Sequence, residues 1–162
     1  MLVLLFELGD DRYAIDVSQV LEVLPLVDLR RLPQAPDGVA GLFDFRGTPV
    51  PVIDLTALTL GRPAQRRFST RIIVVTGPDN GDSHLLGLIA ERATETASRA
   101  ATDFVWPGVT GDHAQYLGPV ATDERGLLQL VDVRQLLPAA ARNLLFTPAL
   151  KASWPSPTSN AS

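Results

Sequence analysis

Along most of the chain, hydrophobic and polar residues alternate or form short apolar runs bounded by Gly, Pro and Asp. Such period-two patterns between turn residues predict short β-strands joined by tight turns. At the N-terminus, Gly9-Asp10-Asp11 separates two apolar runs and predicts a hairpin. Strands are expected at residues 2–8, 13–16, 42–45, 50–55, 71–75, 84–90 and 127–133.

One segment fits two structures. Apolar residues between Val17 and Leu24 recur at i, i+3, i+4 and i+7, which is helical spacing, and Pro25 ends the segment. Its β-branched residues make a strand equally compatible. Near the end of the repeating pattern, residues 132–137 are expected to begin a short closing helix.

Two stretches of the chain resemble each other. RGTPVPVIDLTAL (46–58) and RGLLQLVDVRQL (125–136) each contain Arg-Gly, an apolar strand, an Asp, and a Leu four residues after that Asp. The spacing indicates two related β units, at roughly 1–60 and 70–138, with exchange of strands between them left open. Strands this short favour small barrels over a long sandwich. We therefore expect an all-β fold of two small barrels, with short helical turns.

Pro49 and Pro51 stand two apart in the most apolar stretch. Successive backbone N–H groups of a strand point to opposite edges, so these prolines remove donors from one and the same edge. The apolar residues from Val50 to Leu55 must then pack under another unit or face a partner. Arg46, at the preceding turn, is a candidate interface residue because its planar fork serves several acceptors while its stem packs on apolar groups.

Composition and charge exclude several classes of function. The formal net charge is −4, with only one lysine, so nucleic acid is not expected as the main partner. Cys is absent, which excludes thiolate metal sites and a cysteine nucleophile. The N-terminus has too short an apolar run for a signal peptide or a membrane span, and a cytosolic protein is expected. Residues 139–162 are predicted to be partly helical at first and then a flexible, Pro- and Ser-rich tail.

Catalytic and cofactor motifs are missing as well. The two histidines, His84 and His113, have no carboxylate at a spacing that would complete a ligand set. There is no nucleophile elbow, phosphate-cradling loop or dinucleotide fingerprint, and the acidic loop at 79–82 lacks the Glu that a calcium loop needs. We expect no catalytic residues, no cofactor and no metal. A small-ligand barrel protein and a nucleic-acid-binding barrel are the disfavoured alternatives.

Several of these stretches together carry a family likeness. FELGDDRYAIDVSQVLEV, RLPQAPDGVAGLFDFRGTPVPVIDL and the final LLQLVDVRQLL resemble the CheW-like domain over about residues 2–138. That likeness implies two SH3-like, five-stranded barrels packed on a shared core, and a non-catalytic adaptor. The expected partners are the cytoplasmic hairpin of a methyl-accepting receptor and the regulatory domain of a CheA-type histidine kinase. Direct membrane insertion is not expected, only recruitment to receptor arrays at the inner membrane.

The resemblance also implies partner-binding residues. By motif position, the receptor groove would include Val20 and Glu22, with Gly41 and Leu42 nearby. Arg46 would organise the junction of the two barrels or contact the kinase. For Val20 and Leu42, ordinary core positions are the alternative.

Two stretches of the sequence resemble one subgroup of this family. EVLPLVDLRRLPQAPDGVAGLFDFRG and STRIIVV resemble adaptors of Wsp surface-sensing pathways, whose output is a diguanylate cyclase; a flagellar or pilus chemotaxis adaptor is the alternative. Asp44-Phe45 stands where the family commonly has Asn-Leu, and Ala90-Glu91-Arg92 where Val-Asp-Gly is frequent. These departures are expected to alter partner specificity but not the fold.

Overall fold

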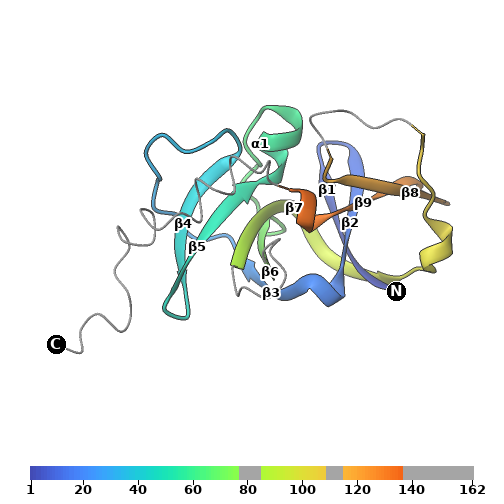
Figure 1. Cartoon of the computed structure of the whole chain (residues 1–162), viewed down its shortest axis with the longest axis horizontal. Helices are drawn as coiled ribbons and strands as arrows, with labels where there is room; N and C mark the ends of the chain where they lie inside the picture. Colours follow the sequence, from blue (N-terminus) through green and yellow to red (C-terminus); the bar gives the residue numbers. More distant parts are fainter. Residues whose placement is uncertain (77–84, 109–114, 137–162) are drawn as a thin grey trace.

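The computed structural model describes residues 1–76, 85–108 and 115–136, which are mostly strands (Figure 1). The strands are β1 (Leu2–Leu8), β2 (Asp11–Asp16), β3 (Val20–Pro25), β4 (Val39–Phe45), β5 (Thr48–Asp54), β6 (Arg71–Thr76), β7 (Leu85–Ser98), β8 (Leu117–Asp123) and β9 (Gly126–Val131). The helical elements in these ranges are η1 (Val17–Gln19), α1 (Leu55–Leu60), η2 (Ala101–Asp103) and η3 (Val133–Gln135).

The strand pairings make two barrels that share one strand. Barrel 1 runs β4-β5-β7-β6-β3, and barrel 2 runs β7-β1-β2-β9-β8. Figure 1 shows β4 and β5 at one end of the molecule, β8 and β9 at the other, and β7 between them. The predicted all-β fold of two small barrels is confirmed.

Each barrel takes strands from both halves of the sequence. The β1–β2 hairpin, from the N-terminal half, lies in barrel 2, where β2 pairs in parallel with β9. In barrel 1, β5 pairs in parallel with β7, which comes from the C-terminal half. The exchange is reciprocal, because the second strand of each Arg-Gly hairpin finds its parallel partner in the other half.

The internal sequence repeat is also a structural repeat. In each copy a hairpin strand ends in an Asp whose side chain caps the helical turn that follows. Asp54 Oδ1 accepts from the backbone N–H of Ala57 in α1, and Asp132 Oδ1 accepts from the N–H of Arg134 in η3. A carboxylate at this position satisfies an N–H group that has no partner inside the helix, which explains why both copies need an Asp there.

A pair of backbone hydrogen bonds narrows the opening of each barrel. In barrel 1, Arg30 and Leu42 exchange N–H to O bonds, each 2.8 Å long. In barrel 2, Val105 and Val120 do the same at 2.9 and 2.8 Å. In both cases the segment that follows one edge strand of the barrel, β3 or β7, bonds to the strand at the other edge, β4 or β8.

Buried apolar residues form three clusters that match this arrangement. The interior of barrel 1 is built around Phe43, Val50 and Ile72, and a smaller cluster with Phe104 fills barrel 2. The largest cluster lies between the barrels, where Phe6 and Tyr13 stack with ring centroids 5.9 Å apart. Burial raises the pKa of the Tyr13 hydroxyl. The apolar strand after Pro49 is therefore core, since Val50, Val52, Ile53 and Leu55 are buried.

Several predicted boundaries change. The ambiguous segment after Asp16 is a short 3-10 turn followed by β3, which pairs with β6 and ends at Pro25. Strand β5 stops at Asp54, and the residues after it form α1. The predicted closing helix is present as η3. The predicted tail at 139–162, His84, His113 and the acidic loop at 79–82 lie outside the described residues.

Candidate functional site

One groove on barrel 1 brings together three of the five predicted partner-binding residues, Glu22, Leu42 and Arg46. It lies between the end of β3, the segment after it, and the β4–β5 turn, and has a volume of about 570 Å³. We call it the Arg46 groove. Its lining residues are Glu22, Leu24, Pro25, Val27, Asp28, Arg30, Leu42, Phe43, Asp44, Phe45 and Arg46.

Arg46 is held at the rim of this groove by its turn. Arg46 and Gly47 both have left-handed backbones, with φ of 52° and 82°, and the Gly47 N–H donates to Asp44 Oδ1 at 2.6 Å. The guanidinium carbon lies 4.9 Å from the centre of the Phe45 ring, while Nη2 donates to Glu22 Oε2 at 2.7 Å. The turn and the aromatic ring thus aim the arginine at a glutamate 24 positions earlier in the chain.

This ion pair contributes little to folding. The Arg46 side chain is 74% exposed and that of Glu22 is 35% exposed, and pairs this open to water are worth about 0 to 1 kcal/mol. A cation over an aromatic face at an exposed site adds about 0.5 to 1 kcal/mol. The arrangement therefore presents a positive and a negative group to solvent in a defined geometry rather than locking the barrel.

Gly41 and Leu42 hold the segment around Arg30 against β4. Leu42 forms the two backbone bonds to Arg30 and is 6% exposed, so it is a floor residue of the groove. Gly41 has φ of 153°, and a side chain there would collide with the Arg30 carbonyl oxygen. Gly41 thus allows the chain to close over β4, and it does not line the groove itself.

Val20 lies elsewhere. It begins β3 opposite Val75 and packs, half-buried, against the shared core. It is not a lining residue of the Arg46 groove. Its position fits the alternative of an ordinary core residue.

The two prolines of β5 close an edge, as their spacing predicts. The Leu42 N–H and C=O groups bond Arg30, so they point away from β5. Backbone groups alternate along a strand, so those of Phe43 and Phe45 point toward β5. Pro49 and Pro51, opposite Asp44 and Leu42, therefore face away from β4. On that side β5 pairs with β7 only from Val52 onward, so the prolines occupy the unpaired part.

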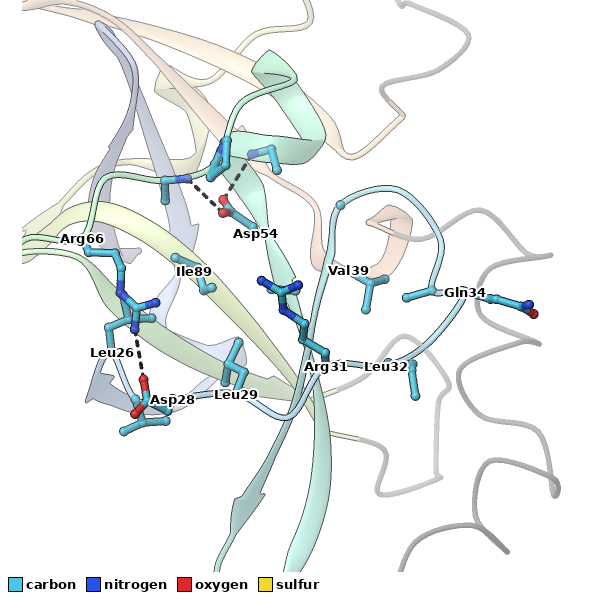
Figure 2. Close-up of a pocket in the computed structure, with 17 residues that line it drawn as sticks. Leu26, Asp28, Leu29, Arg31, Leu32, Gln34, Val39, Asp54, Arg66 and Ile89 are labelled. Atoms are coloured by element: carbon cyan, nitrogen blue, oxygen red, sulfur yellow. Dashed lines mark hydrogen bonds and ion pairs between the residues drawn. The ribbon is translucent and has the colours of Figure 1, made fainter.

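A second hollow of about 810 Å³ lies beside the groove, at the open end of barrel 1 (Figure 2). Leu26, Leu29, Val39 and Ile89 surround it, with charged groups around them. Its buried carboxylate, Asp54, is fully occupied: its two oxygens accept from the N–H groups of Ala57 and Ala64, at 3.1 and 2.9 Å. Among the described residues that line this hollow, no other buried polar side chain is present to orient a ligand in the way that cofactor sites require.

Barrel 2 contains a carboxylate that is bound by two arginines. Arg12 donates two hydrogen bonds to the Asp123 carboxylate, at 2.7 and 2.9 Å, and Arg99 adds a third at 3.2 Å. The hydrogen bonds from Arg12 hold the pKa of Asp123 well below its usual range, and the same contact raises the pKa of Arg12. This cluster joins β2 to the β8–β9 turn and is structural.

The described residues contain no group of three His, Asp or Glu side chains placed to hold a metal ion. None of their helices has the length and apolar character needed to cross a bilayer. What they do contain is a shaped, charged groove on a rigid barrel.

Some groove residues were not anticipated from the sequence. Arg30 and the turn residue Phe45 line it, together with the end of β3. Phe45 could have been found, because a large apolar residue beside a turn arginine often packs against its stem. Arg30 could not, because its place depends on the bridge to Leu42.

Comparisons with known proteins give the family. A model of the CheW-like domain matches residues 2–141, and the chain belongs to that family, whose members are non-catalytic scaffold proteins of bacterial chemotaxis. It is 28% identical to the chemotaxis protein CheW of Treponema pallidum over 81% of this chain and 78% of the relative. It is 31% identical to the protein FrzA of Myxococcus xanthus, over 83% and 84%.

A solved structure supports the fold. The scaffolding protein TtCheW from Thermoanaerobacter tengcongensis superposes with a TM-score of 0.76 at 22% identity, over 86% of this chain and 89% of that one. At this identity the likeness concerns the architecture of two small barrels.

Proposed function

We propose that this protein couples the cytoplasmic hairpin tip of a methyl-accepting receptor to the regulatory domain of a CheA-type histidine kinase, acting only through protein contacts. In this proposal it works in the cytoplasm and is recruited to receptor arrays at the inner membrane. Membership of the CheW-like family supports the adaptor role.

The observation that carries the proposal is the Arg46 groove. An apolar floor with Leu42 and Phe43, next to a Glu22–Arg46 pair at the rim, suits an amphipathic helix with apolar and charged side chains on one face. The groove lies on a barrel whose strands are fixed by the core, so little ordering is needed on binding. We assign it to the receptor hairpin, with Glu22, Leu42 and Arg46 as contacts and with Gly41 allowing the close approach of Arg30; Val20, in the shared core, is not assigned a contact.

Binding of the purified protein to a receptor cytoplasmic fragment and to the kinase, measured by calorimetry, tests this assignment. Arg46→Glu places two acids together at the rim, so we expect receptor affinity to fall at least tenfold while the melting temperature stays nearly unchanged. Glu22→Ala is expected to act in the same direction with a smaller effect.

A matched control is Arg134→Glu. Arg134 is 67% exposed and paired with Asp132 at 3.2 Å, so it resembles Arg46 in exposure and in having a carboxylate partner, but it lies in η3. We expect this variant to bind both partners normally. Normal receptor binding by both groove variants would disprove the groove assignment.

For the pathway, we propose a Wsp-like system that controls a diguanylate cyclase, because the sequences at 22–47 and 69–75 resemble those of Wsp adaptors. A flagellar or pilus chemotaxis adaptor is the second candidate, and the family match favours it equally. Deletion of the gene separates the two: altered cyclic di-GMP on surfaces with normal swimming supports the first, and lost directional movement with unchanged cyclic di-GMP supports the second.

A further inference from the structure

Arg92 has an unusual backbone at a special place in the fold. It lies where β7 leaves barrel 1 and enters barrel 2, between Ala90, which pairs with β6, and Glu95, which pairs with β1. The register of β1 and β7 shifts at this point. Arg92 has φ of 50°, in the left-handed region.

An arginine in this conformation costs folding free energy that a glycine would avoid, because its Cβ crowds the backbone. Its contact within the described residues is an ion pair to Glu7 at 3.4 Å, with the Arg92 side chain 59% exposed. Exposed pairs of this kind return little stability. The side chain is therefore not explained by folding, and strained residues of this sort occur at sites of function.

A small cleft lies beside Arg92. Its volume is about 180 Å³, enough for one side chain and too small for a cofactor. It lies on the face of barrel 2 where β1, β7 and the β8–β9 turn meet. The lining residues are Leu5, Phe6, Glu7, Arg12, Arg92, Thr94, Glu95 and Arg125.

The charges around the cleft are unequally satisfied. Arg12 is occupied by Asp123. Among the described residues, Arg125, at the β8–β9 turn, forms no ion pair, and Arg92 has one loose contact, to Glu7 at 3.4 Å. Glu95 is the second carboxylate of the lining, so three guanidinium groups face two carboxylates there. Two guanidinium groups with spare donors thus face one small opening.

We propose that Arg92 and Arg125 form a carboxylate-binding site that docks an acidic side chain of a second protein partner. Guanidinium groups suit this task because their planar donors match the two oxygens of a carboxylate. A carboxylate carried by a protein fits better than a free anion, because the cleft is open and its rim offers Leu5 and Thr94 for contact. We call it the Arg92 cleft.

The Arg92 cleft shares no residue with the Arg46 groove. An adaptor that holds two partners at once needs two such separate surfaces. The inference rests on the proposed function: because the Arg46 groove is assigned to the receptor hairpin, the Arg92 cleft is assigned to the regulatory domain of the kinase. Arg92 then determines which acidic partner is accepted.

The test uses the full-length protein, with the receptor fragment and the kinase as probes in separate titrations. We expect Arg92→Gly and Arg125→Ala each to weaken binding of one probe by about tenfold and to leave the other unchanged. The affected probe should be the one that Arg46→Glu leaves unchanged. The melting temperature of Arg92→Gly should equal or exceed that of the wild type, and Arg92→Lys should retain part of the affinity.

Arg134→Ala is the matched control, since it removes an arginine of similar exposure outside the cleft. Normal binding of both probes by Arg92→Gly and Arg125→Ala overturns the inference and leaves the proposed function intact. Weaker binding that follows a lower melting temperature also overturns it, because Arg92 would then be structural. If the wild type binds neither probe, the proposed function and this inference both fail.

Discussion

The two barrels contain the same turn, Asp-x-Arg-Gly, at 44–47 and 123–126, and use it in opposite ways. In barrel 1 the turn arginine, Arg46, forms the ion pair to Glu22, while Asp44 only accepts from the Gly47 N–H. In barrel 2 the turn aspartate, Asp123, is held by two arginines, and the turn arginine has no ion pair among the described residues.

Neighbouring strands cause this difference. The Arg12 side chain, from β2, is 12% exposed where it meets Asp123, so water screens that pair weakly. Asp44 is exposed, and in the part of the chain that the structure describes it accepts from the Gly47 N–H and forms no ion pair. The Asp-x-Arg-Gly motif thus stabilises barrel 2 through Asp123, and in barrel 1 it presents the charge of Arg46 to solvent. The lesson is that a repeated turn fixes backbone geometry, whereas the elements packed against it decide whether its charges serve stability or binding.

The largest expected effect on stability comes from removing the ion pairs of Asp123 in barrel 2. Asp123→Ala removes a carboxylate that accepts from Arg12, Arg99 and the Arg125 N–H, so we expect the free energy of unfolding to fall by about 2 to 3 kcal/mol. The equivalent change in barrel 1, Asp44→Ala, should cost less than about 1 kcal/mol. Urea unfolding followed by circular dichroism measures both. Equal losses would refute the contrast between the two turns.

A second comparison concerns the two helix caps. Asp54 is buried and serves two N–H groups, from Ala57 and Ala64, so Asp54→Ala should cost about 2 kcal/mol. Asp132 is more open to solvent and caps η3 only, and Asp132→Ala should cost about 0.5 kcal/mol. Thermal unfolding of the two variants tests the ranking. A larger loss at Asp132 would contradict it.

A third comparison concerns the stability of the protein in acid. The arginine contacts lower the pKa of Asp123, so the folded state prefers its charged form. This contribution is complete above the ordinary carboxyl pKa of about 4 and is lost as the pH falls below it. Between about pH 4.5 and 2.5, the wild type should lose about 1 kcal/mol more stability than Asp123→Asn, after allowance for solvent screening. Parallel pH profiles for the two proteins would contradict this expectation.

Much of the fold could be predicted from the sequence, because its half-buried strands alternate clearly. The hairpins of β1 with β2 and of β4 with β5 follow from that pattern. Strand β8 could not be predicted, since Gly118 and Pro119 interrupt its apolar residues. The second part of β7, ERATETAS, is mostly exposed, and its largely polar sequence lacks the alternation that predicts a strand. Its strand structure comes from pairing with β1, which is a long-range contact.

The candidate site was harder to predict. Arg46 could be selected from its turn and its apolar neighbours, and the structure places it on the groove rim. Its contact with Glu22 could not be predicted, because the two residues meet only when β3 and the β4–β5 turn are folded together. Val20 is similar in character to a groove residue, but a register shift between Val20 and Glu22 separates the two positions. Local sequence does not show such a shift.

The reciprocal exchange of strands makes the chain comparable to a domain-swapped dimer joined into one polypeptide. Neither half contains a complete barrel, because β1 and β2 complete barrel 2 while β6 and part of β7 complete barrel 1. Such an arrangement ties both barrels into a single cooperative unit, dominated by contacts between distant parts of the sequence. The two barrels therefore cannot be separated into independently folding halves, and unfolding one of them removes both the Arg46 groove and the Arg92 cleft.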